Sequence, residues 1–206
     1  GIRFKLIESF FTIDKPGSGL YKEKGSKFLA FAHPVTDSEQ IKSKIEEIKK
    51  EYHDARHYCY AWVLGADKGR FKASDDGEPS HSAGDPILNQ IKSKKLTNIL
   101  VVVVRYFGGV KLGVSRLTIA YKTAALEALN NTLVVEKHIT KSITLQYAYP
   151  ETSIVKNLIN EFRARITSET FNELCTISFE LGVSKEELFR SKIQNLKLQG
   201  VNISLT

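Results

Sequence analysis

Long hydrophobic runs and methionine are missing from this sequence, and cysteine is scarce. The longest apolar run, residues 99–104, is far shorter than the roughly 20 residues of a membrane-spanning helix, and no charged-then-apolar leader opens the chain. The two cysteines, Cys59 and Cys175, lie in separate apolar segments, where a thiol behaves as a small hydrophobe. We therefore expect a cytoplasmic protein with free thiols and no membrane partner.

Low-complexity tracts are also missing, and the composition is globular, with 42% hydrophobic and 26% charged residues. A length of 206 residues suits two unequal domains. Residues 1–137 hold 22 basic and 16 acidic residues, an excess of 6, and residues 138–206 hold 8 and 7, an excess of 1. The basic excess in the first part favours a polyanionic partner there, with a solvated face as the alternative.

Strand and helix signals in the first 137 residues indicate an α+β domain. Antiparallel strands are expected over residues 4–35, a helix after the capping residue Asp37, and a buried strand over residues 57–64. The apolar run over residues 99–104 predicts a central strand that is covered on both faces.

Two further helices are expected in this domain. After a long polar loop over residues 65–85, Asp85 is expected to cap a short helix whose first residue is Pro86. Ser115 is expected to cap a second helix that runs to about Leu129.

A glycine-rich basic turn, hereafter the glycine turn, lies between the central strand and the last of these helices. Its candidate nucleic-acid- or anion-binding residues are Arg105, Tyr106, Phe107, Gly108, Gly109, Lys111, Gly113, Ser115 and Arg116. Glycines let the backbone approach a phosphate, the helix start favours an anion, and the cations can add charge-assisted hydrogen bonds. The aromatic rings can stack on bases. A tight turn that serves only chain reversal and core packing is the alternative.

The glycine spacing matches neither the P-loop nor the dinucleotide fingerprint, so we expect no ATP or NAD cofactor. A second candidate cluster lies on the polar loop, where Asp75, Asp76, Glu78 and His81 fall within seven residues. Such oxygen ligands suit a hard cation, but the spacing fits no EF-hand or zinc pattern, and Asp-Gly and Glu-Pro are turn formers. We expect a turn that forms a lip beside the glycine turn, with no metal and no catalytic residue. The remaining histidines, including His57, are expected to be surface or core residues.

Residues 140–206 carry the pattern strand, helix, strand, strand, helix, strand. This is the order of a ferredoxin-like βαββαβ sandwich, a fold that carries no chemistry by itself. We therefore expect two domains, a basic one over residues 1–137 and a second one over residues 140–206.

Three ordered blocks of the first domain resemble the YigZ/IMPACT family. The blocks are Ser74-Asp75-Asp76-Gly77-Glu78-Pro79, Ala83-Gly84-x-Pro86-Ile87-Leu88 and Val101-Val102-Val103-Val104-Arg105-Tyr106-Phe107-Gly108-Gly109-x-x-Leu112-Gly113. The two-domain layout covers nearly the whole chain, as in the bacterial YigZ-like branch. A glycine pair that is common before Leu117 is here Ser115-Arg116, which adds charge.

The resemblance implies a first domain like the ribosomal-protein-like α/β fold of elongation factor G domain IV, and a second like its ferredoxin-like domain V. It thereby implies an RNA- or ribosome-facing role linked to translation. Eukaryotic IMPACT relatives share the first domain and restrain activation of a general-control kinase through protein contacts. The resemblance therefore also implies a translation-regulatory protein as a possible partner.

Our leading expectation is a non-catalytic or regulatory binder of RNA or the ribosome that uses the glycine turn. The first alternative is a protein-interaction regulator of translation of the IMPACT type, in which the same surface meets an acidic protein. The second is a metal-assisted hydrolase or transferase that acts on a phosphorylated small ligand. It would use the carboxylates of residues 75–81, hereafter the acidic loop, together with the glycine turn.

Overall fold

The computed structural model describes residues 5–206, which divide into two compact units. The basic unit spans Ser9–Lys137, and the C-terminal unit spans His138–Thr206 together with residues 5–8. Sequence reasoning assigned residues 5–8 to the first domain; they group with the other unit, where the carbonyl of Glu8 accepts a hydrogen bond of 2.8 Å from the N–H of Ile139. None of the helices within residues 5–206 has the length and apolar character to cross a membrane.

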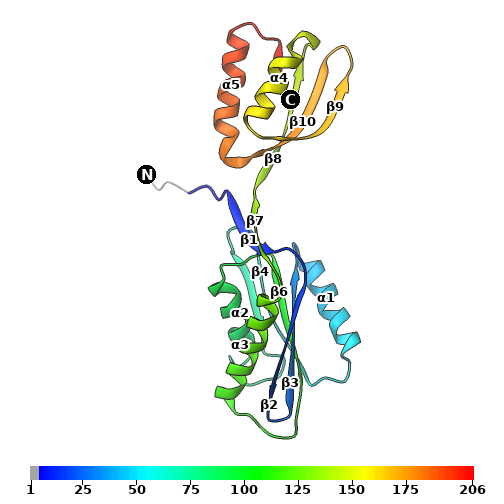
Figure 1. Ribbon diagram of the computed structural model, residues 1–206, viewed down its shortest axis with the longest axis vertical. Coiled ribbons are helices and arrows are strands. Elements are labelled where there is room, and N and C mark those ends of the chain that lie inside the picture. The colour runs from blue at the N-terminus through cyan, green and yellow to red at the C-terminus, as the bar shows by residue number, and fades with distance from the viewer. Residues whose placement is uncertain (1–4) are drawn as a thin grey trace. The chain divides into compact units, whose positions relative to one another are not determined.

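The basic unit is built on an antiparallel sheet with the strand order β2-β3-β6-β4-β5. These strands are β2 (Gly17–Glu23), β3 (Ser26–Pro34), β6 (Ile99–Tyr106), β4 (His57–Leu64) and β5 (Arg70–Ser74). Helix α1 (Ser38–Glu51) covers one face, and α2 (Gly84–Ser93) and α3 (Val114–Asn130) cover the other (Figure 1). Strands β1 (Ser9–Ile13) and β7 (Val134–His138) pair separately.

Strand β6 is the buried centre of this sheet, as its continuous apolar sequence predicts. Val101 and Val103 pack in the core beneath α2 and α3, while Val102 and Val104 pack in the core beneath α1. Successive side chains of a strand point to opposite faces, so both faces of this strand need apolar residues. The same alternation places Arg105 on the side of α2 and α3.

The region 65–85 differs from the long loop that was expected, because it contains β5 and the start of α2. Asp85 is not the cap: α2 begins at Gly84, and the capping position is Ala83. The carboxylate of Asp75 instead accepts hydrogen bonds from the N–H groups of Ala83 (3.2 Å) and Gly84 (2.8 Å). A carboxylate that is distant in sequence therefore satisfies the free donors at this helix start.

The C-terminal unit has one sheet with the strand order β11-β8-β10-β9, packed against two helices. Its elements are β8 (Thr140–Tyr147), α4 (Thr152–Glu161), β9 (Arg165–Phe171), β10 (Cys175–Gly182), α5 (Glu186–Leu198) and β11 (Ile203–Leu205). Phe189 lies at the centre of its core, in edge contact with Phe162 and Phe179 at centroid distances of 5.2 and 5.3 Å.

Because this unit has its own core, residues 138–206 expressed alone are expected to unfold in one cooperative urea transition, monitored by circular dichroism. The matched variant Phe189→Ala is expected to lower the free energy of unfolding of the fragment by about 3–5 kcal/mol. A parent fragment without a cooperative transition would show that the unit depends on the rest of the chain.

Candidate functional site

A buried ion pair lies beneath the glycine turn, at the end of β6. Arg105 is 5% exposed, and its Nη1 donates to Oε1 of Glu78 at 2.6 Å. The guanidinium also lies over the rings of Phe28 (5.4 Å) and Phe107 (5.6 Å). The sequence places Arg105 among the candidate anion-binding residues, but strand alternation turns its side chain inward, where Glu78 neutralises it.

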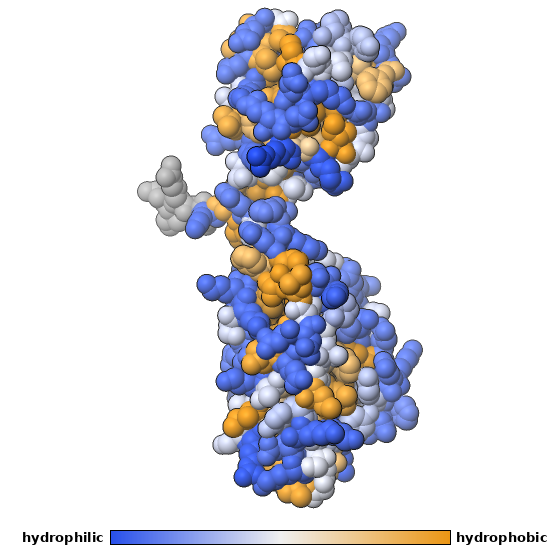
Figure 2. Space-filling model, in the orientation of Figure 1, coloured by the Kyte–Doolittle hydropathy of each residue, from blue (hydrophilic) through white to orange (hydrophobic). Residues whose placement is uncertain are grey.

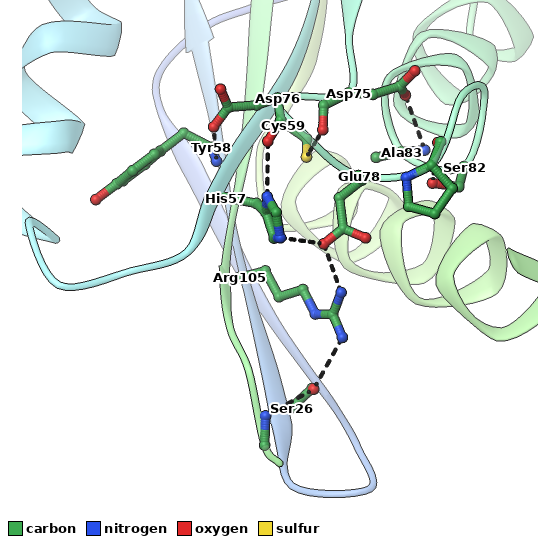
Figure 3. Close-up of polar contacts among 12 residues, drawn as sticks. Ser26, His57, Tyr58, Cys59, Asp75, Asp76, Glu78, Ser82, Ala83 and Arg105 are labelled. Carbon is green, nitrogen blue, oxygen red and sulfur yellow. Dashed lines mark hydrogen bonds and ion pairs between the residues drawn. The ribbon is translucent and has the colours of Figure 1, made fainter. Parts of the chain in front are cut away.

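His57 joins this pair from the start of β4 (Figure 3). Its Nδ1 lies 2.7 Å from the backbone carbonyl of Asp76, and its Nε2 lies 3.1 Å from Oε1 of Glu78. Both neighbours can accept a hydrogen bond from a ring nitrogen. Sequence reasoning missed His57 because its partners lie some twenty residues further along the chain.

The acidic loop is held in place by its own carboxylates. Asp75 accepts from the start of α2 and, through Oδ2, from the N–H of His81 at 2.9 Å. Oδ2 of Asp76 accepts from the N–H of Tyr58 at 2.8 Å. His81 itself is exposed and lies 2.6 Å from Asp85. Of the four residues proposed as a lip, Glu78 is the one that borders the cavity beside the glycine turn.

Within residues 5–206, no group of three or more histidine, cysteine or carboxylate side chains is arranged to hold a metal ion. Cys59, in β4, is buried, and its thiol donates to the carbonyl of Asp75 at 3.1 Å. Burial raises the pKa of this thiol well above its ordinary value. A thiol in such surroundings serves packing rather than nucleophilic chemistry.

The glycine turn packs directly on the β2–β3 hairpin. The N–H of Gly108 donates to Oγ of Ser26 at 3.1 Å. A Cβ atom on Gly108 would lie 2.1 Å from the backbone carbon of Gly25, so glycine is required for this close approach. Helix α3 then begins at Val114, after Gly113 in the left-handed region at φ 81°, and not at a Ser115 cap as expected.

Beside this turn lies a cavity of about 380 Å³. Its wall includes the buried groups Glu78 and Arg105, the half-buried His57, the ring of Phe107, and the start of α3. Two exposed cations, Arg56 and Lys111, also border it. Arg56, which sequence reasoning did not place in the site, lies over the ring of Phe107 at 5.2 Å. The cavity thus combines a basic rim with a largely apolar interior.

A row of basic and aromatic side chains continues from the turn across the sheet. Lys22 on β2 lies directly opposite Lys27 on β3, which lies opposite Tyr106 on β6. These three residues and Phe107 border a second hollow of about 460 Å³. Burial and a hydrogen bond to Asp54 raise the pKa of Tyr106 to about 12, so its phenol adds no negative charge.

The structure therefore brings part of the expected site together. Lys111 and Arg116 are exposed at the turn, with Arg116 4.0 Å from Glu23. Lys22 and Lys27 were missed because strand register, which joins segments some 80 residues apart, was not apparent from the sequence. On the face shown in Figure 2, apolar residues form small, separate areas among hydrophilic ones, as on a solvated surface.

Comparison with known proteins identifies the relatives of this chain. A family model described as "Impact N-terminal domain" matches residues 24–129. "IMPACT family member YvyE" of Bacillus subtilis (strain 168) is 32% identical, over 88% of this chain and 83% of that protein. "IMPACT family member YigZ" of Escherichia coli (strain K12) is 31% identical, over 91% of this chain and 93% of that protein.

A solved structure described as "Crystal structure of an hypothetical protein" is 30% identical, with a TM-score of 0.69 and coverage of 97% of each chain. The likeness therefore extends over both units, beyond the part that the family model matches. These matches confirm the resemblance inferred from the sequence, and the chain belongs to the IMPACT family.

Proposed function

We propose that the basic unit binds structured RNA, on the ribosome or free, and thereby acts in the regulation of translation without catalysing a reaction. The observation that carries the proposal is the row of Lys22, Lys27 and Tyr106, which borders one hollow together with Phe107 of the glycine turn. Cations beside aromatic rings suit a polyanion whose bases can stack. Membership of the IMPACT family supports the link to translation.

The pairing of Lys22 with Lys27 is costly in the free protein. Like charges directly opposite each other destabilise a sheet, by a fraction of a kcal/mol to about 1 kcal/mol. The two lysines are exposed and directly opposed. A bound phosphate relieves this repulsion, so the arrangement favours binding over stability.

A protein partner is the second candidate, because Val110 and Val114 at the turn are 49% and 55% exposed. In that case an acidic, partly apolar protein surface would replace RNA. The enzyme hypothesis gains no support from the acidic loop, since Asp75, Asp76 and Glu78 each already make structural contacts.

The finer fold assignments are part of this proposal. The βαββαβ order of the C-terminal unit, with its four strands in one sheet, supports a ferredoxin-like assignment. We assign the basic unit to the type of elongation factor G domain IV on the resemblance alone. A role at the ribosome implies a cytoplasmic location.

The variant Lys22→Gln/Lys27→Gln/Arg116→Gln is expected to weaken binding to a structured RNA, measured by fluorescence anisotropy over a range of salt concentrations. Loss of three phosphate contacts is expected to reduce the slope of log K against log salt by about 2 to 3. Thermal stability is expected to be equal or higher, because the Lys22–Lys27 repulsion is removed.

The matched control Lys15→Gln/Lys42→Gln/Lys50→Gln removes the same charge from exposed positions outside the row. It is expected to retain most of the affinity. An equal loss of RNA affinity in both variants would indicate general attraction between the positive charge of the protein and RNA. Unchanged RNA binding in the first variant would contradict the proposal and favour the protein partner.

A further inference from the structure

The cavity between the acidic loop and the glycine turn has cations on its rim and a carboxylate on its inner wall. Its rim carries Arg56 and Lys111, neither of which forms an ion pair with any residue that the structure describes. Its inner wall carries the carboxylate of Glu78, whose side chain is 1% exposed. A ligand that satisfies both the cations and the carboxylate must combine an anionic group with a hydrogen-bond donor.

The start of α3 adds to the part of this site that can bind an anion. The first hydrogen bond of the helix runs from the N–H of Leu117 to the carbonyl of Gly113, so the preceding N–H groups have no helical acceptor. The first turn of α3 contains no acidic residue, and its capping position makes no side-chain hydrogen bond in the described chain. Such a helix end attracts a phosphate.

The buried pair supplies a second, independent indication of a ligand. Arg105 borders the cavity, is 5% exposed, and its Nε has no hydrogen-bond partner within residues 5–206. Oε1 of Glu78 contacts both Arg105 and His57, whereas the other carboxylate oxygen makes none of the contacts drawn in Figure 3. Buried polar atoms are rarely left without partners, so the Nε of Arg105 indicates a missing ligand or water.

The remaining wall suits an aromatic or apolar group. Leu112 and Leu117 are buried beneath the cavity, and Phe107, which is 38% exposed, also borders it. A volume of about 380 Å³ is within the usual range for small-molecule sites, roughly 300–1,000 Å³.

We propose that this cavity binds one nucleoside monophosphate unit. Its phosphate lies at Arg56, Lys111 and the start of α3, and an N–H group of its base donates to Oε2 of Glu78. This inference goes beyond the RNA proposal, because the unit can come from a free mononucleotide or from an unpaired nucleotide of RNA.

The test is isothermal titration of the full chain with AMP, GMP, CMP and UMP, and with inorganic phosphate as the probe for the anion alone. At least one nucleotide is expected to bind saturably with a stoichiometry of one. Its affinity is expected to be at least about tenfold higher than that of phosphate, because the base adds stacking and a hydrogen bond to Glu78. Saturable binding of none of the four, or equal binding of phosphate, would overturn the proposal.

The variant Arg56→Gln/Lys111→Gln is expected to weaken nucleotide binding by about tenfold or more. Phe107→Leu, which keeps an apolar side chain, is expected to weaken it by about tenfold through loss of stacking. The control Lys15→Gln/Lys50→Gln is expected to bind as the parent does. Parent-like affinity in the Arg56→Gln/Lys111→Gln variant would also overturn the proposal.

Competition separates the two sources of the nucleotide. Displacement of the bound nucleotide by a hairpin RNA with an unpaired loop assigns the cavity to RNA, and binding of both together assigns it to a free mononucleotide; either result supports the nucleotide site. RNA binding without nucleotide binding would overturn this inference and leave the proposed function standing. Nucleotide binding without RNA binding would support this inference and contradict the proposed function.

Discussion

The variant Glu78→Gln is expected to lower the free energy of unfolding of the basic unit by about 3–5 kcal/mol, because it leaves the charge of Arg105 buried without a counterion. The substitution keeps the shape of the side chain, so the loss reports mainly on charge. Both side chains of the pair are nearly inaccessible, at 6% and 1%. Urea denaturation of the full chain, followed by the fluorescence of Trp62 in β4, measures the effect in this unit.

The control is Glu47→Gln on α1, whose carboxylate lies 2.8 Å from Lys44 but is 64% exposed. This substitution is expected to lower the free energy of unfolding by less than about 1 kcal/mol, since water screens the pair of Glu47 with Lys44. A double-mutant cycle of Glu78→Gln with Arg105→Gln is expected to show that the two losses are strongly non-additive. Equal small effects at Glu78 and Glu47 would mean that Arg105 is solvated, and would restore it as an exposed phosphate contact.

The variant Gly108→Ala is expected to destabilise the basic unit by about 3 kcal/mol or more, because the new methyl group has no space. A Cβ atom there would lie 2.1 Å from the backbone carbon of Gly25 and 2.3 Å from the backbone nitrogen of Ser26. Backbone atoms of a hairpin cannot rotate away as a flexible side chain can. The hairpin and the turn must therefore separate, and urea denaturation measures the cost.

Gly109→Ala is the matched control one residue along the turn. Gly109 has φ 87°, but a Cβ atom there has no neighbour within 4 Å among the described residues. Its cost is expected to be about 1–2 kcal/mol, from the left-handed backbone alone. A Gly108→Ala loss no larger than that of Gly109→Ala would show that the turn does not press against the hairpin.

The sequence predicts those parts of the fold that follow from local pattern. Residues 99–104 are apolar at every position, and a strand with that pattern must be covered on both faces, as β6 is. Asp37 caps α1 as expected, with Oδ1 accepting from the N–H of Gln40 at 2.8 Å. In each case the determining residues are adjacent in sequence.

The site was harder to predict because its contacts join distant segments. The charge of Arg105 suggested an anion-binding role, but its burial depends on Glu78, which lies 27 residues earlier. The opposition of Lys22 and Lys27 depends on the register of a hairpin, and their place beside the glycine turn depends on the pairing of β3 with β6. A single sequence contains no local signal for strand register of this kind.

The close contact between Gly108 and Gly25 has a consequence for the kinetics of binding. The glycine turn is continuous with both β6 and the start of α3, and the contact fixes it to the hairpin that carries the lysines. The cations on both segments therefore hold their spacing before any ligand arrives. A preformed charged surface loses little conformational entropy on association and can bind at electrostatically steered rates. We expect association rather than dissociation to carry most of the salt dependence, as is usual for steered encounters.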